Sequence, residues 1–536
     1  MAHTATDNTI EHFDALVVGA GFGGMYMLHR LRQQGLRTRV IEAGDGVGGT
    51  WYWNRYPGAR CDIPSMEYSY QFSPELQQEW EWSERYATQP EILRYANHVA
   101  DRFELWPDMQ FNTRVTAATF NEDNNLWQVE LDPGAAVTAR FVVMATGCLS
   151  VPNFPQIEGL QDFDGPVYHT GVWPHEGVDF SDQKVGVIGT GSSAIQSIPI
   201  IAEQASSVTV FQRTPNYSVP AHNAPLDPDY VADVKGRYAQ YRAENWQRGF
   251  GADFDDSELS VFDVDDAARQ AEYERRWQIG GLQFLAAYND LVFDDNANAT
   301  AREFIRGKIR EAVRDDALVE KLLPVTPVGC KRLCVDTDYY QTYTQEHVRL
   351  VDLRETPIQQ VTATGVNTSQ QQFEFDCLIL ATGFDAMTGA VTKIDIQGVG
   401  GQRLQDKWAK GPKAYLGLAT AGFPNLFLIT GPGSPSVLSN MLPSIEHHVE
   451  WIADCVAYVN EHQKQRIAAN TNAENEWVTH VNEVADTSVY PHCNSWYLGA
   501  NVEGKERVFM PYLGVPPYVE KCAEVVAQGY DGFDIT

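Results

Sequence analysis

Three glycines that follow an apolar run have the spacing of a diphosphate-binding turn. Gly19, Gly21 and Gly24 form GxGxxG directly after FDALVV and open a segment with helical spacing of apolar residues. Glycines there permit a tight turn and let backbone N–H groups approach a pyrophosphate at a helix N-terminus. Glu42 ends the next apolar run, 23 residues after Gly19, where a carboxylate can accept the ribose hydroxyls of an adenosine. The turn predicts a dinucleotide site, and we expect FAD.

A second glycine turn shares this layout but differs in its charges. Residues 189–194 read GxGxxA after the apolar run KVGVI. The position 23 residues after Gly189 is the neutral Gln212, followed by Arg213 and Thr214. A guanidinium suits a ribose that carries a 2′-phosphate, which a carboxylate would repel. The second cofactor is therefore predicted to be NADPH, and two dinucleotides in one chain imply hydride transfer from nicotinamide to flavin.

Each turn requires a strand before it and a helix and a further strand after it. β-branched apolar runs precede both turns, helical spacing follows, and RTRVIEA and SVTVFQRT supply the next strands. Two more apolar runs, at 140–147 and 376–383, end in the same Ala-Thr-Gly sequence. The predicted fold is α/β, with two Rossmann-like dinucleotide-binding domains, one for FAD and one for NADPH.

The rest of the chain is expected to divide between these two domains and a helical insertion in the second. Charged, helix-rich sequence fills the insertion, where an apolar stripe comprises Phe304, Ile305, Ile309, Ala312 and Val313. Beyond Gly383 the chain should return to the first domain, where one long amphipathic helix carries Ile445, Val449, Ile452, Val456 and Val459. The predicted boundaries are 1–147 and 381–536 for the FAD domain, 148–218 and 331–380 for the NADP domain, and 219–330 for the insertion.

Composition disfavours several classes of partner. The formal charge is 40 − 71 = −31, so nucleic acid or an anionic membrane surface is not expected, because both are bound through clustered Lys and Arg. No stretch approaches the roughly 18 apolar residues that span a bilayer, and the polar, acidic N-terminus is unlike a secretory signal. The eight cysteines form no CxxC pair and are expected to be mostly reduced. We expect a cytoplasmic monomer.

Two longer motifs carry a resemblance to a known family. Residues 163–174, FDGPVYHTGVWP, match the FxGxxxHTxxW[PD] signature of type I Baeyer–Villiger monooxygenases, and residues 48–62, GGTWYWNRYPGARCD, match the second signature of that family. From about residue 13 to its end the chain resembles the phenylacetone and cyclohexanone monooxygenase branch. The resemblance implies that NADPH and O2 convert a cyclic or aryl-alkyl ketone to an ester or lactone through a flavin C4a-peroxide. It also implies sulfoxidation as a side activity.

The resemblance assigns residues to each cofactor and implies no metal site. Together with the first glycine turn, the positions that would contact FAD are Gly19, Gly21, Gly23, Gly24, Glu42, Thr50, Trp51, Tyr52, Trp53, Asp62, Tyr68, Val115 and Met441. The positions that would contact NADP are Arg60, Cys61, Gly189, Thr190, Gly191, Ser192, Ser193, Ala194, Ile195, Gln196, Arg213, Thr214, Lys331, Arg332 and Trp496.

Arg332 is the predicted catalytic residue, with Asp62 as its partner. The reactive arginine of the family follows a lysine shortly before an Asp-x-x-Tyr-Tyr segment, which here is residues 336–340. A permanently charged guanidinium beside the flavin favours the deprotonated peroxide and then the oxyanion of its adduct with the ketone. Asp62 would orient Arg332 and reduce the cost of burying its charge, while Lys331 would bind the 2′-phosphate.

Two other functions remain open. A flavin monooxygenase that oxidises amines or sulfides has a related linker motif but usually lacks Thr170, Trp173 and Pro174. A flavin module that passes electrons to a partner protein would not need Arg332 with Asp62. A disulfide reductase is not expected, because Cys61 has no cysteine nearby to pair with.

Three further segments carry expectations about the linker and the pocket. His169 is expected to couple the linker to the domains by hydrogen bonds, since the reaction needs no histidine base. Residues 431–442, GPGSPSVLSNML, match a loop that lines the pocket in the phenylacetone branch. Residues 511–517, PYLGVPP, carry prolines where relatives usually have more polar residues, so the pocket depends on whether this loop reaches it.

Overall fold

The computed structural model describes residues 10–536, and one sheet is built largely from the N-terminal part of this range. Its strands follow the order β17-β4-β5-β6-β1-β2-β3, with β18 beside β6. Their bounds are β1 Glu11–Val18, β2 Thr38–Ile41, β3 Met109–Gln110, β4 Arg114–Asn121, β5 Leu126–Asp132, β6 Val137–Met144, β17 Asp395–Gln397 and β18 Leu426–Leu428. The pairs β4–β5 and β5–β6 are antiparallel, and the other neighbours run parallel.

A second sheet is parallel throughout, with the order β12-β9-β8-β16-β7. The bounds of its strands are β7 Val167–His169, β8 Lys184–Ile188, β9 Ser207–Gln212, β12 Val348–Asp352 and β16 Cys377–Leu380. Both sheets are buried on two faces: Val17 and Val187 belong to one large core, whereas Leu16 and Ile188 belong to separate cores on the opposite faces. Burial on both faces is typical of parallel sheets that are covered by other layers, and it explains the near-continuous apolar runs of the sequence.

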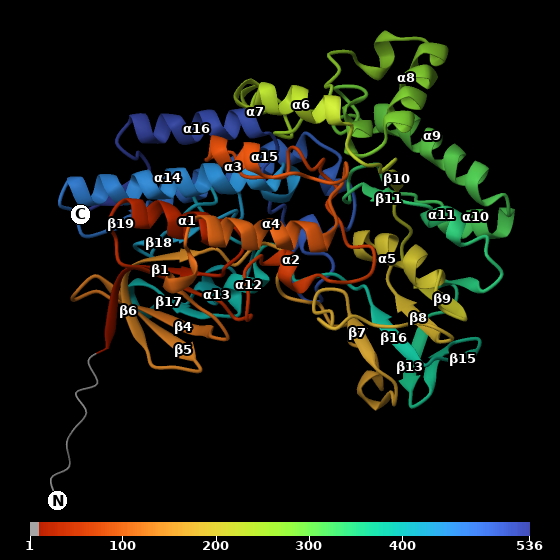
Figure 1. The fold of residues 1–536 in the computed structure, drawn as a ribbon, viewed down its shortest axis with the longest axis horizontal. Coiled ribbons are helices and arrows are strands. Elements are labelled where there is room, and N and C mark those ends of the chain that lie inside the picture. Colours follow the sequence, from red (N-terminus) through yellow and green to blue (C-terminus); the bar gives the residue numbers. More distant parts are fainter. Residues whose placement is uncertain (1–9) are drawn as a thin grey trace, which may run out of the picture.

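Helices α1 (Phe22–Gln33) and α5 (Ser192–Ala202) follow β1 and β8 and begin at the two glycine turns. Figure 1 shows the two sheets side by side in the lower half of the molecule, with α14 (Met441–Glu461) and α16 (Val515–Ala527) above the first. The other helices around the first sheet are α2 Thr50–Trp53, α3 Pro74–Glu79, α4 Gln89–Arg102, α12 Gly389–Thr392, α13 Leu404–Lys407 and α15 Thr471–Asp486. The fold is thus α/β, as predicted.

Between β10 (Ser218–Pro220) and β11 (Cys334–Asp336), which pair in parallel, the chain is mainly helical. Its helices are α6 Pro228–Gly236, α7 Tyr238–Asn245, α8 Asp266–Ile279, α9 Asp295–Val313 and α10 Asp316–Leu322. Four residues of the predicted stripe on α9 are buried, and Ala312 is partly buried. This region lies at the upper right of Figure 1, above the second sheet.

The C-terminal part of the chain contributes β17 and β18 to the first sheet. The long helix predicted there is α14, which buries Val449, Ile452 and Val456, in agreement with the apolar stripe. The remaining elements are α11 Tyr339–Thr342, β13 Ile358–Thr362, β14 Gly365–Thr368, β15 Gln372–Glu374, β19 Ile467–Ala469 and β20 Phe533–Ile535. The domain boundaries given above stay predictions.

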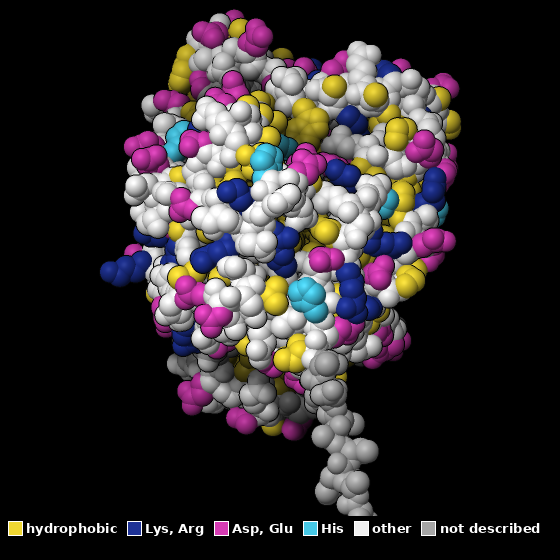
Figure 2. Space-filling model, turned by 90° about the vertical axis from the view of Figure 1, so that its left-hand side faces the viewer, with side chains coloured by type: hydrophobic (Ala, Val, Ile, Leu, Met, Phe, Trp, Pro, Cys, Tyr) yellow, Lys and Arg dark blue, Asp and Glu magenta, His cyan; other side chains and the backbone are white. Residues whose placement is uncertain are grey.

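The cysteines are largely as expected, with one exception. Six are free and buried, but Cys330 and Cys493 form a disulfide, with Cα atoms 6.3 Å apart. The two cysteines are 163 residues apart, so no spacing pattern in the sequence indicates that they pair. On the face in Figure 2, Lys and Arg side chains are interspersed among Asp and Glu, so the net negative charge does not form a one-sign field there.

Candidate functional site

The first glycine turn is shaped by close backbone contacts. Gly19 has a φ of +105°, and a Cβ there would lie 2.6 Å from the backbone oxygen of Ala145 in the first Ala-Thr-Gly run. A Cβ on Gly24 would lie 1.8 Å from the oxygen of Gly19, so only glycine permits this packing of helix on strand. Gly21 precedes α1 without a side-chain cap, which leaves the first N–H groups of the helix for a ligand.

Other residues predicted to contact FAD lie around this turn. Glu42 is buried at the end of β2, and its carboxylate accepts hydrogen bonds from Ala20 N at 2.7 Å and Gly44 N at 2.8 Å. The segment before Thr50 packs on the turn, because a Cβ on Gly49 would lie 2.9 Å from the Cα of Gly21. One further hydrogen bond within the predicted set runs from Trp51 Nε1 to the hydroxyl of Tyr68, 3.1 Å away.

The remaining predicted FAD positions lie on several elements. Tyr52 donates to Asp45 at 2.6 Å, and Trp53 packs on the Tyr52 ring with centroids 4.8 Å apart. Val115 is buried in β4, and Met441 begins α14. Among residues 10–536, no hydrogen bond joins the side chain of either residue to the glycine turn.

The second glycine turn repeats the geometry of the first. Gly189 has a φ of +114°, and a Cβ there would lie 2.3 Å from the oxygen of Ala381 in the second Ala-Thr-Gly run. A Cβ on Gly191 would meet nothing within 4 Å, so open space lies in front of the start of α5. Ala194 is fully buried, which fits the small residue that close helix packing requires. Thr190 donates to the backbone oxygen of Thr214 at 3.0 Å.

Two cations lie near each other beside this turn. Burial lowers the pKa of Lys331, and the nearby guanidinium of Arg213 lowers it further. Lys331 is partly buried and Arg213 is exposed. Among residues 10–536, neither cation takes part in an ion pair with a carboxylate. Two unpaired cations in proximity favour the binding of an anion between them.

Helix α5 is joined directly to the segment that carries Asp62. The Oε1 atom of Gln196 accepts a hydrogen bond from Tyr56 at 2.9 Å, and its Nε2 donates to the backbone oxygen of Arg60 at 3.1 Å. Arg60 also forms an ion pair of 3.4 Å with Glu84. Ser192 and Ser193 contact Cys334 at 3.2 Å and Thr170 at 3.1 Å. Ile195 is fully buried in the helix. Segment 48–62 therefore contacts both the first glycine turn, through Gly49, and the helix that follows the second turn, through Tyr56 and Arg60.

Arg332 and Asp62 form a bidentate pair across 270 positions of sequence. Nε and Nη2 of the guanidinium donate to the two carboxylate oxygens, both at 2.9 Å, and Nη1 donates to the backbone oxygen of Val437 at 2.7 Å. Burial alone lowers the pKa of Arg332, but the charge and hydrogen bonds of Asp62 raise it above its ordinary value. A guanidinium has five N–H groups, so two remain free for a developing negative charge.

The thiols near this pair are unreactive groups. Burial raises the pKa of Cys61 well above its ordinary value and that of Cys148 to about 11. Both are therefore neutral near pH 7, and Cys61 is a free cysteine.

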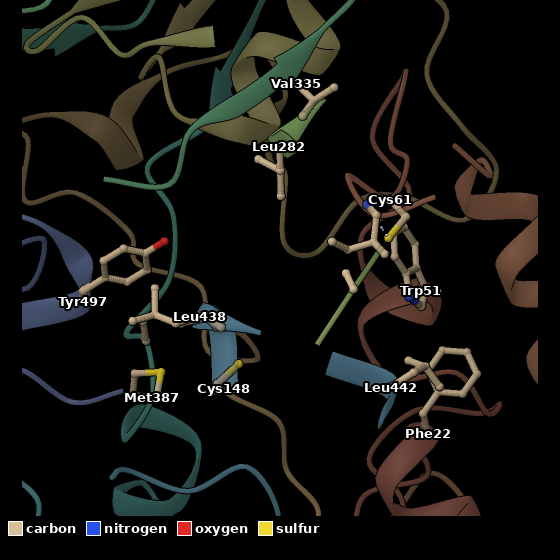
Figure 3. Packing of buried hydrophobic residues seen from close by; sticks show 14 of the residues in the cluster. Phe22, Trp51, Cys61, Cys148, Leu282, Val335, Met387, Leu438, Leu442 and Tyr497 are labelled. Atoms are coloured by element: carbon tan, nitrogen blue, oxygen red, sulfur yellow. Dashed lines mark hydrogen bonds between the residues drawn. The ribbon is translucent and has the colours of Figure 1, made fainter. Parts of the chain in front are cut away.

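Two residues near Arg332, Phe250 and Tyr497, were not identified as site residues from the sequence. The ring of Phe250 lies 5.6 Å from the guanidinium carbon of Arg332. Arg332 also lowers the pKa of the buried Tyr497, although burial raises that pKa more. In Figure 3 Tyr497 and Leu438 lie on one side of the view, and Trp51 and Cys61 lie on the other. In the sequence, Phe250 is marked only by the glycines around it in GFGADF, and Tyr497 only by the aromatic residues around it. Neither pattern indicates a contact with Arg332.

The other expectations about the linker and pocket segments can be compared with the structure. His169 is buried, accepts a hydrogen bond from Gly171 N at 2.9 Å and contacts Thr382 Oγ1 at 3.3 Å, so it does link the linker to the end of β16. Burial lowers its pKa to about 4. Residues 511–517 reach the Phe250 segment, because Val515 N donates to the oxygen of Gly249 at 3.0 Å. Trp496 packs on Tyr497 with ring centroids 4.4 Å apart.

Residues 10–536 contain neither a candidate membrane-spanning helix nor a candidate metal site. No helix within residues 10–536 is long and apolar enough to cross a membrane. The same residues contain no group of His, Cys, Asp or Glu side chains arranged to hold a metal ion.

Comparison with known proteins gives matches over nearly the whole chain. A family model described as pyridine nucleotide-disulphide oxidoreductase matches residues 16–248. A Baeyer–Villiger monooxygenase from Pseudooceanicola batsensis is 41% identical, over 97% of this chain and 95% of its own length. A phenazine N-monooxygenase from Lysobacter antibioticus is 40% identical, over 98% of both chains.

Solved structures agree with these relatives. A steroid monooxygenase bound to NADP is 50% identical, with a TM-score of 0.93 over 98% of this chain and 99% of its own. OTEMO, solved with FAD and NADP, is 38% identical, with a TM-score of 0.95 over 98% and 99% of the two chains. Closed cyclohexanone monooxygenase has a TM-score of 0.97 at 40% identity, over 98% of this chain and 100% of its own. This chain belongs to the type I Baeyer–Villiger monooxygenase family.

Proposed function

We propose that this enzyme uses NADPH and O2 to insert one oxygen atom beside the carbonyl of a small cyclic or aryl-alkyl ketone, giving a lactone or ester. The bidentate Arg332–Asp62 pair carries the proposal, because it holds a permanent cation with free N–H groups on the segment that Gln196 joins to α5. The proposal includes the monomeric state and cytoplasmic location that the composition suggested.

The first turn fits FAD. Gly19 and Gly24 permit the tight turn, because a Cβ on either would clash with a backbone oxygen. Helix α1 begins without a side-chain cap, and Glu42 is held at the end of the next strand. These groups would bind the pyrophosphate and the adenosine ribose of FAD. When bound, FAD would accept hydride from NADPH and would then activate dioxygen.

The second turn fits NADPH. Open space in front of Gly191 and the start of α5 would receive the pyrophosphate. Lys331 and Arg213, which have no carboxylate partner among residues 10–536, would bind the 2′-phosphate. Thr214 follows Arg213 and would contact the same ribose.

Arg332 would act by charge, since arginine stays protonated at any physiological pH. Its free N–H groups would stabilise the oxyanion that forms when oxygen adds to the ketone carbonyl. Asp62 would hold the guanidinium in one orientation through its two hydrogen bonds of 2.9 Å, so the donors are in position before the reaction begins. The large core around the pair would exclude water.

Oxidation of nitrogen or sulfur is the second candidate. The phenazine N-monooxygenase at 40% identity favours it, since that relative is named for a reaction at nitrogen. We propose sulfoxidation as a side activity, because a sulfide needs oxygen transfer but no oxyanion at a carbonyl carbon. A transfer to sulfide would therefore depend less on Arg332 than ester formation does.

Product analysis with the purified protein, FAD, NADPH and O2 tests the proposal. The panel should include cyclohexanone, an aryl-alkyl ketone, a thioether and a phenazine. The expected products are a lactone or ester from the ketones and a sulfoxide as the slower product. An N-oxide as the main product would favour the second candidate, and hydrogen peroxide alone with every compound would refute both.

A further inference from the structure

Residues 248–254, called the Phe250 loop here, follow α7 and cover one face of Arg332. The Phe250 ring lies 5.6 Å from the guanidinium carbon and is stacked on Phe254, with ring centroids 4.9 Å apart and planes 16° apart. A cation over an aromatic face is attracted by it, and the ring also keeps water from that face. The position of this loop therefore affects both the cation and the space beside it.

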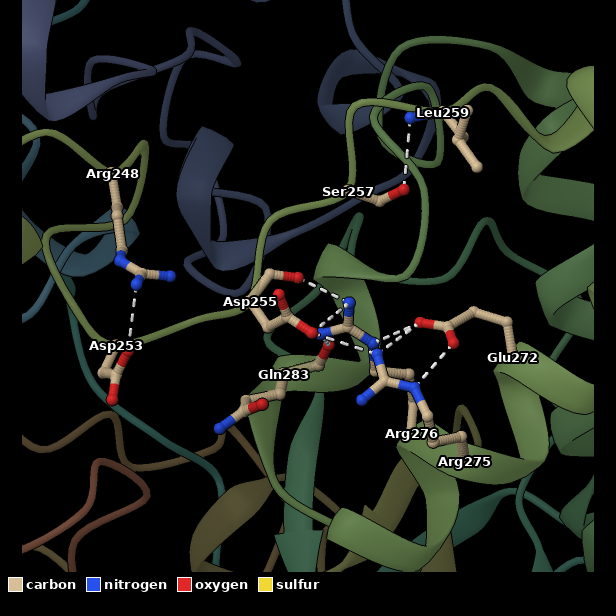
Figure 4. Close-up of polar contacts among 9 residues, drawn as sticks. All are labelled: Arg248, Asp253, Asp255, Ser257, Leu259, Glu272, Arg275, Arg276 and Gln283. Carbon is tan, nitrogen blue, oxygen red and sulfur yellow. Dashed lines mark hydrogen bonds and ion pairs between the residues drawn. The ribbon is translucent and has the colours of Figure 1, made fainter.

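The C-terminal end of the loop, at residues 253–255, is held by the helical region. Figure 4 shows Arg248 paired with Asp253, which lie 3.1 Å apart, and Arg276 of α8 reaching the backbone oxygen of Asp255. Arg276 is only 2% exposed and pairs with Glu272 at 2.7 Å. A buried, paired arginine is a firm anchor, because moving it would leave a charge without its partners.

The same end of the loop is also bound by the carboxylate of Glu67. Its Oε2 atom accepts a hydrogen bond from the backbone N–H of Asp253 at 2.6 Å and a longer one from Asn245 Nδ2 at 3.5 Å. Glu67 is 2% exposed and lies five residues after Asp62 in the chain. One side chain thus joins the loop over Arg332 to the segment that carries the partner of Arg332.

The backbone of Glu67 extends this connection. Its oxygen accepts hydrogen bonds from Arg242 Nη1 of α7 at 2.7 Å and from Asn440 Nδ2 at 3.1 Å. Asn440, the residue before α14, also donates its N–H to the oxygen of Phe250 at 2.9 Å. The loop, the Asp62 segment and the loop 431–442 therefore meet at Glu67.

We propose that Glu67 is a positioning residue for ketone oxidation: its carboxylate holds the Phe250 loop against Arg332 and thereby sets the shape of the ketone pocket. This rests on the proposed function. Without the carboxylate the partly buried N–H of Asp253 loses its acceptor, which is unfavourable. The loop is then held only by its remaining contacts, at Gly249, Phe250 and Asp255, and Phe250 is positioned less firmly over the guanidinium. The glycine turns have no contact with Glu67, so cofactor binding stays as it was.

Three variants separate positioning from general stability. Glu67→Leu keeps similar bulk and removes the acceptor, while Glu67→Gln retains one acceptor oxygen. Glu446→Leu is the matched control, because Glu446 is also buried and accepts two backbone N–H bonds, from Gln71 and Phe72 at 2.9 Å, but does not contact the loop. If Glu67→Leu does not fold, Glu67→Asp replaces it, since its shorter side chain withdraws the carboxylate from Asp253.

In Glu67→Leu we expect the KM for ketone to rise about tenfold, which corresponds to the loss of one hydrogen bond to a charged group. More of the NADPH should end as hydrogen peroxide, while FAD content and the rate of flavin reduction stay near wild type. In Glu67→Gln the KM for ketone should stay near the wild-type value, and Glu446→Leu should not raise it. Amide hydrogen exchange should quicken over 248–255 in Glu67→Leu alone.

The outcomes distinguish this inference from the proposed function. If the wild type makes ester and Glu67→Leu changes neither the KM nor the exchange of 248–255, the inference is wrong. If Glu446→Leu raises the KM as much as Glu67→Leu, the effect is one of stability and the inference is also wrong. If the wild type makes no ester, the proposed function fails, and normal exchange of 248–255 in Glu67→Leu would overturn the positioning role as well.

Discussion

Preference for NADPH over NADH follows from two cations beside the second glycine turn. Arg213 is exposed and Lys331 is partly buried, and the charge of Arg213 adds to the effect of burial in lowering the pKa of Lys331. Replacing either one by alanine removes one charge from the predicted 2′-phosphate site. The backbone of the turn, which would bind the pyrophosphate common to both coenzymes, is unchanged.

The expected loss of preference for NADPH differs between the two alanine variants because Arg213 and Lys331 differ in their exposure to solvent. A hydrogen bond to a charged group contributes about 1.5–3 kcal/mol, and solvent screening puts an exposed group at the lower end. For Arg213→Ala this gives a loss of about tenfold in the preference for NADPH. Lys331→Ala should lose more, since Lys331 is less exposed to solvent. The effects should not add fully in the double variant, because both cations contact the same phosphate.

The assay is the rate of flavin reduction by each coenzyme, measured as kcat/KM for wild type and for the single and double variants. The wild type should prefer NADPH by tenfold or more, and the double variant should approach equality through a loss with NADPH alone. Arg349→Ala is a control, since this exposed arginine lies on β12 and donates to Gln371. Equal kcat/KM for both coenzymes in the wild type and in Arg213→Ala would refute the assignment.

Three further predictions concern the flavin, a thiol and pH. One FAD per chain should be released by acid denaturation, and flavin that stays on the polypeptide would contradict non-covalent binding. Cys61→Ser should keep ester formation, because a buried neutral thiol does no redox chemistry, and its loss would contradict this. Burial raises the pKa of Glu67 to about 7 and that of Glu446 to about 8. The folded protein is therefore most stable, with respect to these two groups, below about pH 4.5, and it loses that stability as the pH rises through about 7 and 8. The double variant Glu67→Gln/Glu446→Gln should lose less Tm than wild type between about pH 6 and pH 9, and an equal loss would contradict the shifts.

Local features were predictable from the sequence because their causes are local. The conformations of Gly19 and Gly189 follow from the strand–turn–helix pattern, and the stripe on α14 follows from spacings of three and four. The pair Arg332 and Asp62 was predicted only through the resemblance, since 270 positions separate the two residues and no spacing rule connects them.

Contacts between distant segments could not be predicted in this way. Gln196 joins Arg60 across 136 positions, and its polar side chain on a helix looks like any exposed residue in the sequence. Cys330 and Cys493 gave no signal, because pairing depends on how the chain folds and not on their spacing. Phe250 belongs to a charged, irregular stretch without periodicity, so its place over Arg332 appears only in three dimensions.

Ester formation by Arg332→Ala tests the central claim most directly. The variant should bind FAD, since Arg332 contacts neither glycine turn, and flavin reduction by NADPH should be affected less than product formation. Removing a preorganised cation from a developing oxyanion costs about 10²–10³ in rate, so NADPH consumption should yield hydrogen peroxide and little ester. Lys331→Ala should instead weaken NADPH binding and keep consumption coupled to ester. An Arg332→Ala enzyme that makes ester at nearly the wild-type rate would contradict the role assigned to this guanidinium.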